Sequence, residues 1–177
     1  MALRDLVKDV HTQAEESPFA QLLMSGNITE RQYKHYLFQQ LNAYEALETR
    51  ADELGILDEI PSIKRSGHIF HDYVDLNAAG SFEVFSNVQR YVEYVKDLNA
   101  QQCWAHIYVR HFGDMYGGNM ISKRIPFGKH TMYEFEDKKG LIEYVRSKLT
   151  EDMADEAKLV FSYAIKMFKE LEKEYDL

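Results

Sequence analysis

The stretch from Arg110 to Gly118 places three glycines and a carboxylate inside what otherwise has the pattern of a long helix. Each interior glycine costs up to about 1 kcal/mol relative to alanine. Gly113 and Gly117 are four residues apart and therefore remove side chains from one face, where a flat ligand could lie against bare backbone. Close helix packing at small residues is the alternative. Arg110 and Asp114, which also share a face, favour a binding site.

His11 lies beside the apolar stripe of the first amphipathic segment, where a histidine is a hydrogen-bonded core residue more often than a metal ligand. Glu15, one helical turn later, is placed to accept the proton of the imidazole nitrogen that does not face a metal. Arg4 and Lys8 flank this position and are placed to meet carboxylates at the edge of a large ligand. An ordinary solvated helix face is the alternative for both basic residues, and an ordinary exposed residue is the alternative for Glu15.

Helices must position these residues, because apolar side chains recur at three- and four-residue steps along most of the chain. Thr29 and Gln32 have the spacing of a capping box, and Gly26 is placed to end the helix before it. Residues 77–81 form the clearest linker, and the polar stretch up to Gly140 is expected to be partly irregular. No repeat or strand series is found, so the fold expected is a single all-α helical bundle over residues 1–177. The expected helices cover residues 3–16, 17–26, 29–54, 62–76, 82–98, 99–126 and 150–171.

Composition excludes several classes of protein. With 177 residues and 45% hydrophobic content, the chain is long and apolar enough for one folded domain. No apolar run approaches the roughly 20 residues that span a bilayer, and the N-terminus lacks a secretion signal, so we expect a cytoplasmic protein with no membrane partner. Cys103 is the single cysteine, which excludes a disulfide framework. The net charge of -8 disfavours nonspecific nucleic-acid binding.

Two segments together resemble the heme oxygenase family, and the resemblance covers most of the chain. Val10–Glu15 resembles the family's proximal helix, and Tyr108–Gly118 resembles its distal helix. Tyr44–Glu48 resembles the segment with a distal-pocket tyrosine, and Val145–Lys148 the segment with a heme-propionate arginine. The resemblance implies a bundle that holds heme between a proximal helix and a glycine-kinked distal helix. The implied reaction converts heme, with O2 and electrons, to biliverdin, carbon monoxide and ferrous iron.

The resemblance also implies roles for individual residues. His11 is the axial ligand of the heme iron and Glu15 its hydrogen-bond partner. Gly113 and Gly117 let the distal helix lie low over the ring, so that sterics set where oxygen attacks. Asp114, with Arg110 and Tyr44, holds a water network that delivers protons. The candidates for binding the propionates are Arg4, Lys8, Tyr108 and Arg146.

Three positions depart from the family's pattern. Tyr116 stands where the family usually has a small serine, and Asn119 where glutamine is commoner. Ile142 stands where relatives often carry another basic residue. These changes are expected to reshape the pocket and to loosen one propionate contact.

The chain resembles the soluble microbial or viral type of heme oxygenase, which implies a ferredoxin or similar small protein as electron donor. Such donors are typically acidic, so docking would need a local positive face on this acidic chain; scattered surface charge is an equally good interpretation. Two other functions stay open: a heme carrier or sensor on the same fold, and a cofactor-free hydrolase of the thiaminase type. The basic residues proposed for the positive face are Arg4, Lys8, Lys123, Arg124, Arg146 and Lys148.

The remaining histidines have no assigned chemistry. His68 and His71 have a possible ligand spacing, but no carboxylate shares their face, so no complete metal site is expected. His111 flanks the distal motif without a role. The three that are expected to be surface or partly buried polar residues are His35, His106 and His130.

Overall fold

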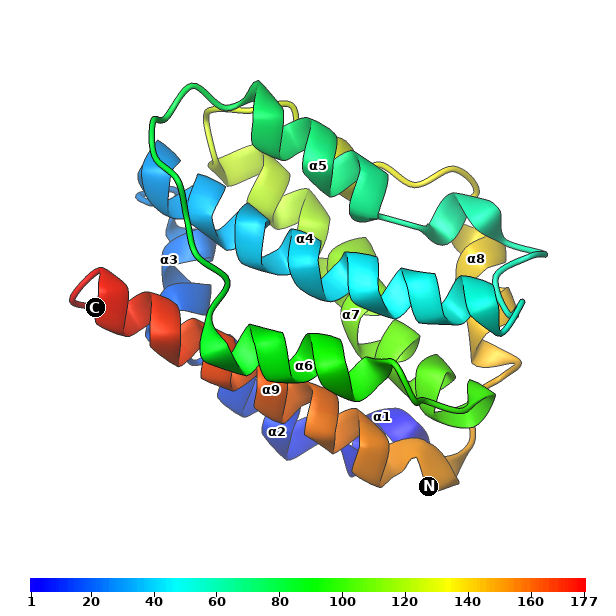
Figure 1. Cartoon of the computed structure of the whole chain (residues 1–177). Coiled ribbons are helices and arrows are strands. Elements are labelled where there is room, and N and C mark those ends of the chain that lie inside the picture. Colours follow the sequence, from blue (N-terminus) through cyan, green and yellow to red (C-terminus); the bar gives the residue numbers. More distant parts are fainter.

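The computed structural model describes all residues from Met1 to Leu177 and contains helices and no strand, which confirms the expected all-α class (Figure 1). Three short 3-10 helices connect or precede the α-helices. The α-helices are α1 (Leu3–Leu6), α2 (Lys8–Glu15), α3 (Pro18–Ser25), α4 (Glu30–Glu53), α5 (Ser66–Asp75), α6 (Ser86–Val95), α7 (Ala100–Arg124), α8 (Lys138–Arg146) and α9 (Ala154–Glu174). The 3-10 helices are η1 (Pro61–Ile63), η2 (Thr131–Tyr133) and η3 (Glu151–Met153).

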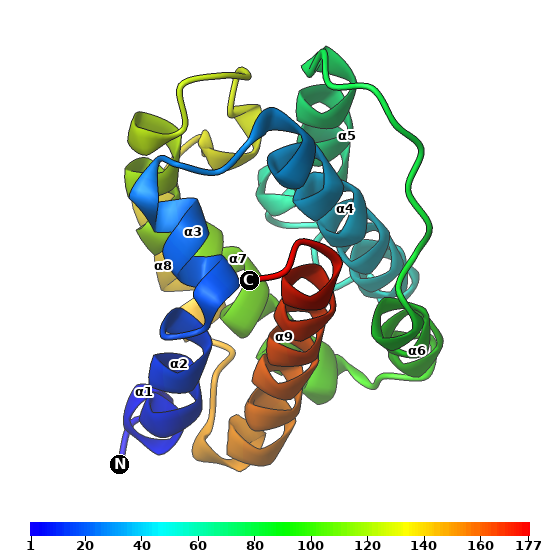
Figure 2. The same ribbon diagram turned by 90° about the vertical axis from the view of Figure 1, so that its left-hand side faces the viewer.

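Two long helices organise the packing. Helix α4 runs across the molecule with α5 on one side and α6 on the other (Figure 1). Helix α9 packs against α2, α3, α6 and α7, and the perpendicular view shows α2 and α3 stacked along one side of it (Figure 2). The helices that carry His11 and the glycine-rich motif therefore share α9 as a support. The relative position of the two motifs is set by that helix.

Capping explains where the two long site-bearing helices begin. At α4, the Thr29 side chain accepts from the Gln32 amide while the Gln32 side chain accepts from the Thr29 amide, so the predicted capping box is confirmed. Asn99 and Gln102 form the same reciprocal pair at the start of α7. Gly26 ends α3 with a φ of 80°, as its position predicted. Helix α7 stays helical through all three of its glycines.

Several expected boundaries were wrong; for example, the helix expected from residue 62 begins at Ser66. The first helix is interrupted at Val7, whose φ of -106° and ψ of 6° separate α1 from α2. The last helix begins at Ala154 and not at Thr150. Thr150 stands at the N-cap position of the short 3-10 helix η3, and its side chain makes no capping hydrogen bond. Residues 82–85 are not helical, and α6 begins at Ser86.

Contacts with α4 hold residues 82–85 out of a helix. The Gln39 side chain donates to the Glu83 carbonyl at 2.8 Å and accepts from the Phe85 amide at 3.1 Å. The His35 ring stacks on Phe82 with centroids 4.4 Å apart. His35 is buried, which corrects the expected surface or partly buried position, and burial together with the charge of Arg31 lowers its pKa to about 4. A neutral imidazole thus anchors this segment.

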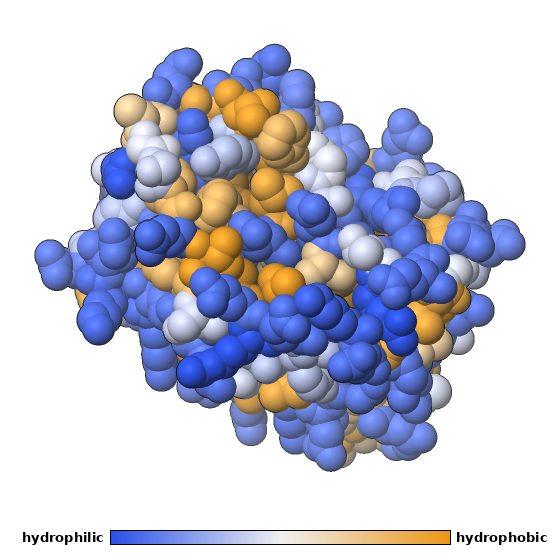
Figure 3. All heavy atoms as spheres, viewed as in Figure 1, coloured by the Kyte–Doolittle hydropathy of each residue, from blue (hydrophilic) through white to orange (hydrophobic).

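The surface is predominantly polar. Figure 3 shows hydrophilic side chains over most of the face viewed in Figure 1, with apolar atoms gathered near α5. Phe70 and Val74, one turn apart on α5, are among the exposed large apolar side chains. None of the helices combines the length and apolarity that crossing a membrane requires.

Candidate functional site

Two of the three glycines in α7 face open space, and the third is a packing residue. A Cβ added to Gly113 or Gly117 would meet no atom within 4 Å. A Cβ on Gly118 would lie 2.4 Å from Cδ1 of Tyr133, so this glycine lets the η2 segment approach the helix. The first two therefore leave a strip of bare backbone exposed on α7, which is the surface that a flat ligand requires.

Asp114 is buried next to this strip and paired with Tyr44 of α4. The Tyr44 hydroxyl bonds to Asp114 Oδ2 and lies 2.9 Å from the carbonyl oxygen of Arg110. Burial raises the pKa of Asp114 to about 6, although the Tyr44 hydrogen bond and the nearby cations oppose that rise. The hydroxyl has one proton for two acceptors when Asp114 is ionised. A protonated Asp114 can donate to the hydroxyl, which leaves the hydroxyl proton for the Arg110 carbonyl, so a buried carboxyl at this position can take up and release a proton near neutral pH.

Arg110 is also buried and is oriented by aromatic rings. Its Nε donates to the Tyr91 hydroxyl at 2.9 Å, and its guanidinium lies 4.2 Å from the centre of the same ring. Tyr91 in turn meets Nδ1 of His106 at 2.7 Å, and His106 Nε2 meets Glu156 at 2.7 Å. This chain of polar groups links α9 to Arg110. His106 is fully buried, so its expected position, at the surface or partly buried, was wrong.

His111 and Glu48 form a second buried pair that sequence reasoning missed. His111 Nε2 lies 2.8 Å from Glu48 Oε2, and the imidazole meets the Tyr44 ring edge-on at 5.0 Å between centroids. Glu48 also accepts from the amides of Arg65 and Ser66, at 2.6 and 2.9 Å. Burial opposes ionisation of Glu48, but these donors lower its pKa below the ordinary value. The carboxylate therefore ties the start of α5 to α7.

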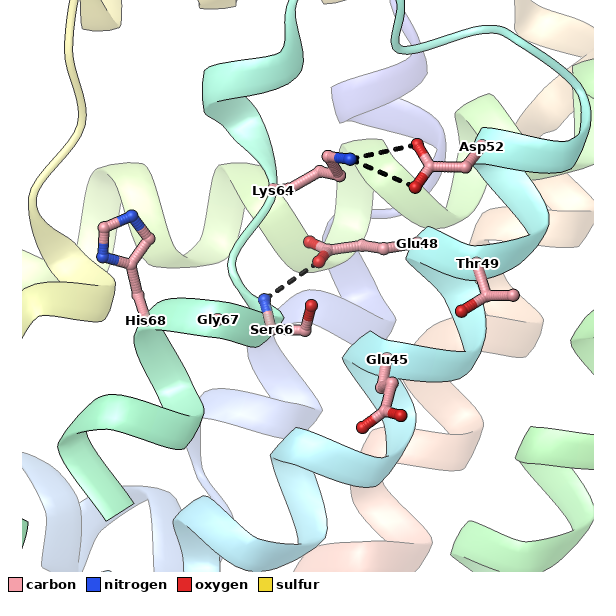
Figure 4. Close-up of a pocket in the computed structure, with 8 residues that line it drawn as sticks. All are labelled: Glu45, Glu48, Thr49, Asp52, Lys64, Ser66, Gly67 and His68. Atoms are coloured by element: carbon pink, nitrogen blue, oxygen red, sulfur yellow. Dashed lines mark hydrogen bonds and ion pairs between the residues drawn. The ribbon is translucent and has the colours of Figure 1, made fainter. Parts of the chain in front are cut away.

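Glu48 is one of the residues that line a polar cavity of about 460 Å³ between α4 and the start of α5 (Figure 4). No hydrophobic residue lines it. Figure 4 shows Glu48 turned toward the Ser66 amide, with Lys64 paired to Asp52 at the rim. The only sequence signal for this arrangement was the one-turn spacing of Tyr44 and Glu48 on one helix. His130, the other histidine expected near the surface, is also buried and bonds to Tyr33 and the Ile125 carbonyl.

His11 is more exposed than its helical pattern predicted. Helix α2 buries no residue, and 54% of the His11 side chain is accessible, with Phe161 of α9 edge-on to the ring at 5.7 Å. Glu15 Oε1 lies 3.1 Å from His11 Nε2. Glu15 and His11 are therefore in contact, as expected, and the contact engages Nε2 of the imidazole. A metal at Nε2 would require Glu15 to release that nitrogen or to meet Nδ1 instead.

Three of the four predicted carboxylate-binding residues, from α1, α7 and α8, lie close enough for their charges to interact. Burial raises the pKa of Tyr108, and the positive charges of Arg4 and Arg146 oppose the rise, which places cations from α1 and α8 near this face of α7. Arg146 Nη2 donates to the Tyr116 hydroxyl at 2.9 Å. Lys8 is exposed and makes no recorded side-chain contact. The polar groups of this cluster can receive a ligand with acidic edges.

The proposed positive face is only partly free. Arg124 donates to the Met24 carbonyl at 2.7 Å and so ties α7 to α3, and Lys148 lies 5.1 Å from the centre of the Tyr144 ring. Lys123 is exposed and makes no recorded side-chain contact. Arg124 is thus partly occupied by a structural contact.

A comparison with known families decides what kind of protein carries this site. The sequence profile of heme oxygenase matches residues 1–170. The chain belongs to the heme oxygenase family. Heme oxygenase 1 of Synechocystis is 26% identical over 199 residues, covering 96% of this chain and 83% of that protein. Heme oxygenase 1 of Homo sapiens is 27% identical over 137 residues, covering 69% of this chain and 46% of the human protein.

Solved heme oxygenase structures share the fold. Heme oxygenase-1 from Synechocystis, crystallised in complex with heme, superposes with a TM-score of 0.83 at 23% identity, over 97% of this chain and 91% of that one. Heme oxygenase from Leptospira interrogans has the same TM-score at 24% identity, with 95% and 97% covered. Membership of the heme oxygenase family supports an enzyme of heme degradation. This membership favours heme degradation over the thiaminase-type hydrolase.

Proposed function

We propose that this heme oxygenase opens the heme ring to biliverdin, carbon monoxide and ferrous iron, using O2 and electrons from a protein donor. The observation that carries the proposal is the position of the buried Asp114–Tyr44 pair beside the open backbone of Gly113 and Gly117. A flat surface and a proton-holding carboxyl on one helix are the two features that controlled ring opening needs. When bound, the heme iron supplies the binding and activation of O2.

His11 is proposed as the axial ligand. Its ring is accessible, and a neutral imidazole donates less electron density than a thiolate, which weakens the push toward O–O cleavage. Glu15, already in contact with the ring, accepts the proton of the nitrogen that stays free and so fixes the imidazole's orientation.

On the distal side, the chain controls space and protons. Without side chains at Gly113 and Gly117, α7 can lie close to the ring, so backbone atoms limit the directions open to oxygen. Asp114 holds a proton that Tyr44 orients, and Arg110 keeps the aromatic wall behind them in place. A water network between Asp114 and the ligand is the proposed route of proton delivery.

The acidic edge of heme fits the cluster of cations described above. Arg4 and Arg146 are proposed to bind the propionates together with the Tyr108 hydroxyl, and Lys8 extends this cluster along α2. Each charged pair adds orientation as well as affinity, since guanidinium groups bind carboxylates through two parallel donors.

A ferredoxin-like acidic protein is the proposed electron donor. The whole chain carries a net charge of -8, so attraction must come from a local set of exposed cations. Lys8, Lys123 and Arg146 are exposed, and the charge of Arg4 acts on Tyr108 together with that of Arg146. Docking there would bring the donor to the ligand's edge and would weaken as salt is raised.

Titration with hemin followed by reduction under oxygen tests the proposal. The wild-type protein should give the Soret band of a histidine-ligated heme and then a biliverdin spectrum. His11→Ala should lose or alter that band, whereas His71→Ala, an exposed histidine on α5, should leave it unchanged. A heme complex that persists under reductant and oxygen would instead identify a carrier. An unaltered Soret band in His11→Ala would remove His11 as the ligand.

A further inference from the structure

Tyr116 is an aromatic residue with an unusual degree of exposure. It lies on α7 between Gly113 and Gly117, and 57% of its surface is accessible to solvent. At about 100° of rotation per residue, its side chain flanks Gly113 on the side opposite to Arg110 and Asp114. The open backbone strip is therefore bordered by the proton-holding carboxyl on one side and by this phenol on the other.

The Tyr116 ring is held in place from two directions. Phe112 meets it edge-on at 5.8 Å between centroids, and Phe112 is itself edge-on to Tyr108 at 5.5 Å, so the three rings form a row along α7. Arg146 Nη2 donates to the Tyr116 hydroxyl at 2.9 Å from α8. Both contacts fix the hydroxyl at the edge of the open strip.

The direction of that hydrogen bond leaves a donor unused. A guanidinium has no acceptor, so the phenol oxygen must accept, and its own O–H stays available to donate. The structure records no other partner for the Tyr116 hydroxyl. Arg146 is exposed as well, and it has further N–H groups. The Tyr116 O–H and the Arg146 guanidinium thus present hydrogen-bond donors side by side. The charge of Arg146 also acts on Tyr108, as does that of Arg4.

We propose that Tyr116 is a carboxylate-binding residue of this site, which donates its O–H to an acidic group of the tetrapyrrole that Arg146 binds at the same time. The inference rests on the proposed function. It makes Tyr116 a specificity-determining residue: the site should distinguish a tetrapyrrole with free carboxylates from one in which they are esterified. An ester lacks the charge that strengthens both hydrogen bonds.

The experiment compares two ligands and two tyrosine variants by absorbance titration of the purified protein. Hemin carries free carboxylates, and hemin dimethyl ester carries none. Tyr116→Phe keeps the ring and removes the O–H, and we expect it to weaken hemin binding about tenfold while leaving binding of the dimethyl ester unchanged. Tyr73→Phe on α5, whose hydroxyl makes no recorded hydrogen bond, is the matched control and should alter neither.

A second arm tests the coupling to Arg146. If both groups hold the same carboxylate, Arg146→Gln and the double variant with Tyr116→Phe should bind hemin with similar affinity, because the second change removes a contact that the first has already weakened. Equal effects of Tyr116→Phe on the two ligands, or no effect on either, would overturn the inference while leaving heme binding intact. Failure of the wild-type protein to bind hemin would instead overturn the proposed function.

Discussion

The Tyr44 hydroxyl from α4 contacts Asp114 Oδ2 from α7 inside a fully buried pair, although the two residues are 70 positions apart in the chain. The same hydroxyl lies 2.9 Å from the Arg110 carbonyl, one helical turn before Asp114. This geometry gives the carboxyl a fixed direction, and burial, against the effect of the Tyr44 hydrogen bond, raises its pKa to about 6.

Asp114→Asn should leave heme binding nearly unchanged and slow ring opening. The amide keeps the size of the carboxyl but cannot take up and release the proton, and such proton transfer typically contributes a factor of about 100 or more. Hemin titration and the rate of biliverdin appearance measure the two effects separately. Asp97→Asn, at an exposed position after α6, is the control. Bilin formation at the wild-type rate in Asp114→Asn would refute the role assigned to the carboxyl.

The stability of the protein should depend on pH through Asp114. Its pKa is about 6 in the folded state, against an ordinary value of 3.8, so between these values the folded chain holds the proton more tightly than the unfolded chain does. Ionisation of Asp114 therefore lowers the free energy of unfolding as pH rises from about 4 to 6. The total loss is about 3 kcal/mol, and this loss does not grow further at higher pH.

Urea unfolding of the wild type and Asp114→Asn at several pH values tests this sign. Other carboxylates contribute equally to both proteins and cancel in the difference. The stability of the variant relative to wild type should increase by about 2 to 3 kcal/mol between pH 4 and pH 7.5. Parallel pH dependences would show that Asp114 titrates at its ordinary value.

Gly113 and Gly118 of α7 should respond in opposite ways to substitution by alanine. Gly113→Ala places a methyl group in open space inside a helix, so it should stabilise the ligand-free protein by up to about 1 kcal/mol. Gly118→Ala places its Cβ against the Tyr133 ring and should cost about 1 to 3 kcal/mol. Chemical denaturation measures both. Hemin affinity should fall in Gly113→Ala despite the gain in stability, and a variant that is more stable with unchanged affinity would argue against a ligand on this strip.

Glu48→Ala should be strongly destabilising. It removes the acceptor of two amides at the start of α5 and leaves the Nε2 of a fully buried His111 without a partner, a loss of about 3 kcal/mol. Thr49→Ala, the exposed neighbour on the same helix, should change the free energy of unfolding by less than about 0.5 kcal/mol. Similar unfolding midpoints for the two variants would contradict the structural role of this carboxylate.

The sequence by itself determined the all-α class, the bounds of α4 and the position of the glycine-rich segment inside a long helix. These features depend on local physics: helical periodicity, the reciprocal Thr29–Gln32 cap and the left-handed conformation of Gly26. It failed for residues 82–85, because the contacts that keep them extended come from Gln39 and His35, more than forty residues earlier.

Only the tertiary structure decided which polar groups meet in the interior. Periodicity shows that Asp114 and His111 share α7, but the packing of α4 against that helix pairs them with Tyr44 and Glu48. The packing of α9 likewise pairs His106 with Glu156. A charged or polar side chain can be buried where a hydrogen-bond partner compensates its lost hydration. When that partner is distant in sequence, the packing of helices decides which residue it is, and the periodicity of one helix cannot show it.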